Sequence, residues 1–189
     1  MTQLPHDDQQ QLPQDYAYPA SKHASEQALE AAEFSSYLLA KTYFDVHEYD
    51  RAAFVLKDAK SKKSRFLALY ARYIAGEKRK EEDSEMVLGP LDGGQAINKE
   101  VLPILAAIEV VIAEQAKKRE PDTEDDSFLL FLYGIVLKRQ GNEADARGAF
   151  IKSVNLYPYN WSTWQELGAT IGSISDVCTP PPEVDARRR

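Results

Sequence analysis

A spacing of apolar residues and glycine occurs twice near the C-terminal end of the chain, and it restricts the possible folds more than any other feature. Each copy begins with a large apolar residue. Three positions later comes Tyr or Leu followed directly by glycine, and three positions after the glycine comes another apolar residue. The two glycines, Gly134 and Gly168, lie 34 positions apart. Such a period indicates stacked helical units rather than a single globular core. The copies consist of Leu130, Tyr133, Gly134 and Leu137, and of Trp164, Leu167, Gly168 and Ile171.

The residues that follow the first copy are those that two crossing antiparallel helices need. Gly134 and Ala146 have little or no side chain, so two backbones can approach there. Phe150 can fill the wedge between the helices, and Pro158 lacks an N–H group and ends the second helix. This is the tetratricopeptide signature, and it predicts an all-α, right-handed solenoid of about three to four helix pairs. The residues expected to pack the pairs are Ala40, Ala52, Ala71, Gly134, Ala146, Phe150, Pro158, Trp164 and Gly168.

The chain divides into an arm, a helical array and a tail. Residues 1–24 are polar, carry Gln and Pro and show no period, so a disordered arm is expected. One repeat is interrupted, because Gly76 is expected to end a helix before a charged loop. The last helix would lack a covering neighbour, which suggests a fragment of a longer array. The predicted ranges are a solenoid over 25–175, with repeats near 33–64, 64–119 (loop 76–98) and 127–160 and a half repeat at 161–172, and a disordered tail over 176–189.

Composition and residue types exclude several classes of function. The net charge of −7 argues against a protein that binds nucleic acid through general electrostatics. A single cysteine cannot build a disulfide framework, and no apolar run is long enough to span a membrane. His6, His23 and His47 do not form a set with metal-ligand spacing or a base for a nucleophile. We therefore predict no catalytic site, no metal site and no cofactor.

Two surfaces of the predicted solenoid are candidates for binding. The first helix of each pair lines the concave groove, where an apolar helix could bind. The N-terminal repeat has no preceding neighbour, so its outer face needs cover, which a second copy of the chain could supply. The groove positions are Arg72, Phe131, Ile135 and Gln165, and the expected dimer interface consists of Leu29, Phe34, Tyr37, Leu38 and Lys41.

Several segments, most of them outside the 34-residue signature, carry a family resemblance. They include the stretch from Glu48 to Ala53, Phe66-Leu67, Leu88-Gly89-Pro90-Leu91 and Leu132-Tyr133-Gly134. Together they resemble the N-terminal region of the eighth subunit of the anaphase-promoting complex, the cell division cycle protein 23 family. The resemblance covers roughly residues 25–172.

The resemblance implies a non-catalytic scaffold of a mitotic ubiquitin ligase, found in the nucleus and cytoplasm. It implies a homodimer that forms through the N-terminal repeats, with other subunits of the complex as further partners. A co-activator would bind later repeats of the family, and this chain does not contain them.

Two other readings of the chain are possible. A co-chaperone-type adaptor would bind a chaperone's C-terminal carboxylate, and it needs Lys and Asn at the two groove positions of one repeat. The pairs at these positions do not fit that requirement. An enzyme with an appended repeat domain would need sequence that the repeats leave unused, and little remains. The groove pairs are Tyr37/Lys41, Ala68/Arg72, Phe131/Ile135 and Gln165/Ala169.

Overall fold

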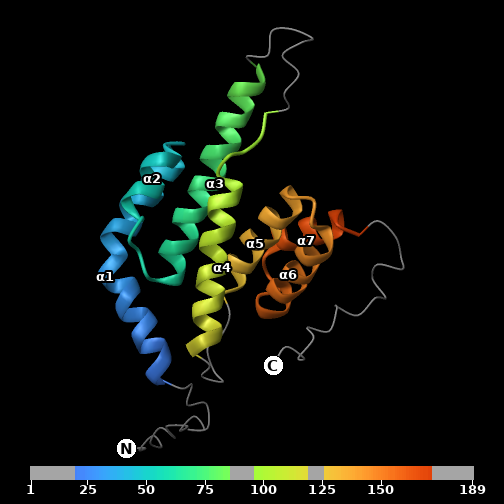
Figure 1. Cartoon of the computed structure of the whole chain (residues 1–189). Coiled ribbons are helices and arrows are strands. Elements are labelled where there is room, and N and C mark those ends of the chain that lie inside the picture. The colour runs from blue at the N-terminus through green and yellow to red at the C-terminus, as the bar shows by residue number, and fades with distance from the viewer. Residues whose placement is uncertain (1–19, 86–95, 119–125, 172–189) are drawn as a thin grey trace, which may run out of the picture.

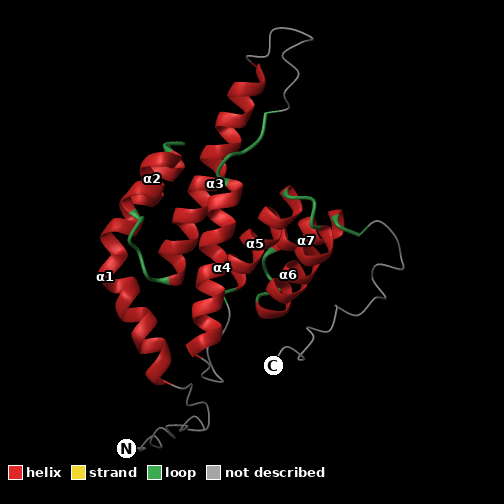
Figure 2. Ribbon diagram, in the orientation of Figure 1, coloured by secondary structure: helices red, strands yellow, loops and turns green. Residues whose placement is uncertain are grey.

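The computed structural model describes residues 20–85, 96–118 and 126–171, and these parts of the chain form seven α-helices without a strand (Figures 1 and 2). This confirms the predicted all-α class. No helix in the described ranges is long and apolar enough to cross a membrane. The helices are α1 (Ala20–Asp45), α2 (Tyr49–Val55), α3 (Lys62–Glu85), α4 (Val101–Lys118), α5 (Ser127–Arg139), α6 (Glu143–Leu156) and α7 (Trp161–Ala169).

Consecutive helices pack as a tetratricopeptide-type array. Figure 1 shows α1 and α2 on one side, α3 and α4 in the middle, and α5, α6 and α7 on the other side. Three clusters of buried side chains hold the array together. Residues of α1, α2 and α3 form one cluster, residues of α3, α4 and α5 form the second, and residues of α5 and α6 form the third. The core is therefore continuous along the array, as expected for a solenoid whose units bury their faces on their neighbours.

The pair α5–α6 shows why the 34-residue signature folds as it does. The side chain of Asp126 accepts hydrogen bonds from the N–H groups of Phe128 and Leu129 and begins α5. Gly141 has φ 81°, a left-handed conformation that glycine adopts freely, and it turns the chain into α6. A Cβ atom at Gly134 would overlap the ring of Phe150, which is fully buried. The absent side chain thus sets the distance between the two helices.

The structure places the predicted packing residues in two groups. Ala40, Ala52, Ala71, Ala146 and Phe150 have no exposed surface. Gly134 is buried as well. The other three members lie toward the C-terminal end and are open to solvent. Pro158 lies in the turn after α6, Trp164 is 45% exposed, and a Cβ atom at Gly168 would meet nothing within 4 Å.

Two predicted boundaries are wrong. The first helix begins at Ala20 rather than Ser25. The second error is larger, because α3 passes through Gly76 and continues to Glu85. Residues 77–85 are mainly Lys, Arg and Glu, which are strong helix formers, and Lys80 forms an i,i+3 ion pair with Glu77. The charged run is therefore the end of a helix, which projects beyond the other helices in Figure 1.

Several predictions concern residues outside the described ranges. These are most of the N-terminal arm, the Leu88–Leu91 motif and the tail over 176–189.

Candidate interaction surface

The outer face of α1 is apolar and exposed. Phe34 is 60% exposed and Leu38 is 54% exposed. Together with Lys41 they follow the i, i+4, i+7 spacing of one helix face. Lys41 is held by an ion pair with Asp45 one turn later. Leu29, the first predicted member of the interface, is 36% exposed.

Tyr37 differs from the other residues of the predicted interface. Its ring is partly buried against the cluster that α1, α2 and α3 share. The Nζ atom of Lys63 lies 4.4 Å from the ring centroid, which is a cation–π contact. Tyr37 therefore connects α1 to α3, and a substitution there would disturb folding as well as any contact with a second chain.

Three further apolar residues, outside the predicted interface, are also exposed in this part of the chain. Leu39 is 47% exposed, Val46 is 63% exposed and Phe54, on α2, is 67% exposed. Leu39 and Val46 are seven positions apart, which is the spacing of one helix face, although Val46 lies one residue beyond the end of α1.

The groove positions do not form one accessible apolar surface, which corrects the predicted groove. Phe131 is only 8% exposed and packs 6.4 Å from Phe150, centroid to centroid. Ile135 is partly buried against the same cluster, whereas Gln165 is exposed. Phe131 is a member of the buried cluster that α5 shares with Ala146 and Phe150 of α6.

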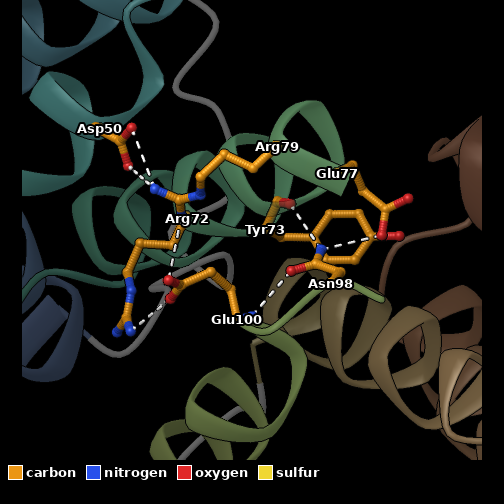
Figure 3. A network of polar contacts seen from close by, with 7 residues as sticks. All are labelled: Asp50, Arg72, Tyr73, Glu77, Arg79, Asn98 and Glu100. Carbon is orange, nitrogen blue, oxygen red and sulfur yellow. Dashed lines mark hydrogen bonds and ion pairs between the residues drawn. The ribbon is translucent and has the colours of Figure 1, made fainter. Parts of the chain in front are cut away.

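Arg72, the remaining groove residue, belongs to a network of charged and polar side chains (Figure 3). Its guanidinium lies 2.9 Å from Glu100, and Arg79 lies 3.1 Å from the other oxygen of the same carboxylate. Arg79 also reaches Asp50 of α2 at 3.2 Å. The network thus links α2, α3 and the segment that leads into α4.

Asn98 holds the start of α4 against α3. Its Nδ2 atom donates to the carbonyl of Tyr73 at 3.1 Å and to Glu77 at 3.0 Å, while its Oδ1 atom accepts from the N–H of Glu100 at 2.9 Å (Figure 3). A Cβ atom at Gly76 would overlap this side chain. Gly76 is therefore a point of close approach inside α3 and not the end of that helix.

The same network extends to α5. Arg139 donates to the hydroxyl of Tyr73 at 3.0 Å and lies 3.5 Å from Glu77. Burial raises the pKa of Tyr73, although the hydrogen bond and the charge of Arg139 oppose this. The hydroxyl of Tyr73 therefore stays protonated. Through these contacts the network joins α2, α3 and α5.

A second polar contact anchors α1. The carboxylate of Glu33 accepts hydrogen bonds from the N–H of Lys60 and from the N–H and hydroxyl of Ser61, at 2.6–3.4 Å. Glu26 accepts from the N–H of Lys62 at 2.6 Å. These N–H groups lie at the N-terminus of α3, where a helix has unsatisfied donors and favours negative charge. Two carboxylates of α1 thus cap α3.

Among the described residues, no cluster of His, Cys, Asp and Glu could hold a metal ion. The contacts above are those of packing, capping and ion pairing between helices. The described surface also carries exposed apolar side chains, among them Phe34 and Leu38 of α1.

Comparison with known proteins gives a consistent result. The family model for anaphase promoting complex subunit 8 / Cdc23 matches residues 2–182. Anaphase-promoting complex subunit 8 of Arabidopsis thaliana is 48% identical over 145 residues, which cover 77% of this chain and 24% of that protein. The cell division cycle protein 23 homolog of Homo sapiens is 40% identical over 138 residues, which cover 73% and 22%. Subunit CDC23 of Saccharomyces cerevisiae is 28% identical over 185 residues, which cover 79% and 30%.

The chain spans about a quarter of the length of the curated relatives it matches. The family model nevertheless covers nearly all of its residues, and the resemblance predicted from the sequence is confirmed. The chain belongs to the anaphase promoting complex subunit 8 / Cdc23 family of tetratricopeptide-type proteins.

Proposed function

We propose that the chain is a non-catalytic scaffold part of the anaphase-promoting complex, a ubiquitin ligase of the cell cycle, and that it homodimerises through its first helix pair. Names of relatives as subunits of that complex support the first part of the proposal. Its partners would then be a second copy of itself and other subunits of the complex. Its place of action would be the nucleus and cytoplasm.

The observation that carries the dimer is the exposed apolar face of α1. Phe34 and Leu38 lie one turn apart, and the described chain leaves both more than half exposed. Burying a large apolar side chain is worth roughly 1.5–3 kcal/mol. A two-fold contact buries each residue twice, and each side chain is only about half exposed, so the four contribute about 3–6 kcal/mol before the cost of association. A dimer at micromolar concentration requires about 8 kcal/mol after that cost, so these two residues would form the centre of a larger contact.

The co-chaperone alternative has less support. It requires a cationic and an amide side chain free to bind a carboxylate in one groove. Arg72, the cation at a groove position of the second pair, is already paired with Glu100 at 2.9 Å.

Sedimentation velocity tests the dimer. We expect Phe34→Glu and Leu38→Glu to give folded monomers at concentrations where the unchanged chain is a dimer, because a carboxylate cannot be buried unpaired. Leu102→Glu is the matched control. Leu102 is 68% exposed on α4, so the same substitution there should leave the mass unchanged.

Circular dichroism checks that each variant retains its helices. A monomeric unchanged chain at micromolar concentration would contradict the proposal. So would a Leu102→Glu variant that dissociates while Phe34→Glu and Leu38→Glu remain dimeric.

A further inference from the structure

Helix α4 is apolar on two opposite faces, although the described chain covers only one of them. Ile104 and Ile108 are fully buried against α3 and α5. On the other face, Leu102 is 68% exposed and Val110 is 57% exposed. An apolar helix face is normally buried against another element. The outer face of α4 is thus a candidate for contact with a partner that the described ranges do not supply.

The outer face has the shape of a docking surface for a helix. Leu102, Ala106, Val110 and Ala113 are all exposed, and they follow an i, i+4, i+8, i+11 spacing that places them in one stripe. We call these four residues the α4 stripe. The two alanines lie between larger neighbours, and small residues let another helix approach closely. The 18 residues of α4 give the helix a length of about 27 Å, which is room for several turns of a partner.

Acidic residues flank the α4 stripe on both sides. At 100° per residue, Glu109 lies toward one edge of the exposed face and Glu114 toward the other. Both are exposed, and neither forms an ion pair within the described ranges. The only basic side chain described on this face is Lys117, at its far end. The flanks therefore favour a partner with positive charge on both sides of an apolar stripe.

We propose that the outer face of α4 binds an amphipathic helix of a partner protein, with an apolar stripe flanked by Arg or Lys. A second copy of the chain fits this face less well. A two-fold pairing centred on the stripe would bring Glu109 of one chain toward the same carboxylate of the other, with no cation near the centre. The face also lies on α4, away from the α1 residues to which the dimer is assigned.

A pair of synthetic peptides tests the charge and the apolar stripe together. Both are helical, match α4 in length and carry the same leucine stripe, but one has Arg flanks and the other Glu flanks. We expect fluorescence anisotropy with the full chain to show the Arg-flanked peptide binding at least about tenfold more tightly. Val110→Lys should remove most of that binding. The charge swap Glu109→Arg with Glu114→Arg should reverse the preference, so that the Glu-flanked peptide binds more tightly.

Leu38→Glu on α1 serves as the control, and it should leave peptide binding unchanged. Equal binding of the two peptides, or undiminished binding by Val110→Lys, would overturn the proposal. Loss of binding in Leu38→Glu would place the peptide on α1 and overturn it as well. If Val110→Lys instead halves the mass in sedimentation, the occupant is a second copy, and the partner helix is ruled out. Failure of the α1 dimer alone leaves these outcomes unaffected.

Discussion

At the scale of single residues, the absence of a side chain determines how closely helices pack. Gly134 and Gly168 occupy the same place in the 34-residue signature, but their surroundings differ. A Cβ atom at Gly134 would overlap Phe150, whereas one at Gly168 would lie in open space. The first glycine is required by a neighbouring helix, and the second is not required by any contact in the described chain.

Substituting each glycine by alanine should separate these two cases. Gly134→Ala should lower the free energy of unfolding by about 1–3 kcal/mol, because Phe150 is fully buried and has no room to move. Gly168→Ala should raise it by up to about 1 kcal/mol, because alanine favours the helix. Urea unfolding at equilibrium measures both. Equal effects of the two substitutions would show that the overlap with Phe150 is relieved without cost.

At the scale of elements, polar side chains decide how helices from different pairs are joined. Glu26 and Glu33 attach α1 to the start of α3, where the N–H groups of a helix lack internal partners. Asn98 attaches the start of α4 to the middle of α3. These contacts supplement the shared core, since Ala40 of α1 is fully buried in the same cluster as Ala71 of α3.

The pH dependence of stability should reveal the contact made by Glu33. Partial burial raises the pKa of this carboxyl, but its hydrogen bonds to Lys60, Ser61 and Ser64 outweigh burial and hold the pKa below the ordinary 4.5. A carboxyl whose pKa is lowered in the folded state stabilises the fold at pH values above its pKa in the unfolded state. This stability is lost as the pH falls through the pKa of the folded state.

The melting temperature of the unchanged chain should therefore exceed that of Glu33→Gln near neutral pH. The difference should shrink as the pH is lowered below about 4.5. Glu30→Gln, at an exposed position on the same helix, is the control and should show no such pH-dependent difference. A constant difference between the unchanged chain and Glu33→Gln at all pH values would mean that the charge of Glu33 does not contribute.

At the scale of the whole molecule, the array has exposed apolar surface on more than one side. The stripe on α1 and the stripe on α4 lie on different helices, so each can be occupied without the other. A solenoid has room for this because each unit contacts only its neighbours and leaves its outer surfaces free.

If α1 mediates a dimer, thermal stability should depend on protein concentration. Association involves only the folded chain, so each tenfold increase in concentration adds about 1.4 kcal/mol per dimer and raises the melting temperature. The melting temperature of Leu38→Glu should not change over the same range. A melting temperature of the unchanged chain that is independent of concentration across the micromolar range would contradict dimerisation.

The sequence by itself determined the all-α class and the family. These depend on local properties: a 34-residue period, small residues such as Ala146 where backbones cross, and short segments that resemble the family, such as Leu132-Tyr133-Gly134. Each can be read along the chain, because it concerns residues that are near in sequence or repeated at a constant interval.

Only the tertiary structure decided which apolar residues are exposed and what Gly76 does. Gly76 looks like the end of a helix in the sequence, but the charged run after it is helical and Asn98 packs against it. Phe131 looks like a groove residue, yet it is buried and packs against Phe150 of α6. In each case the outcome depends on a side chain or a helix that is distant in sequence, and no local pattern specifies that neighbour.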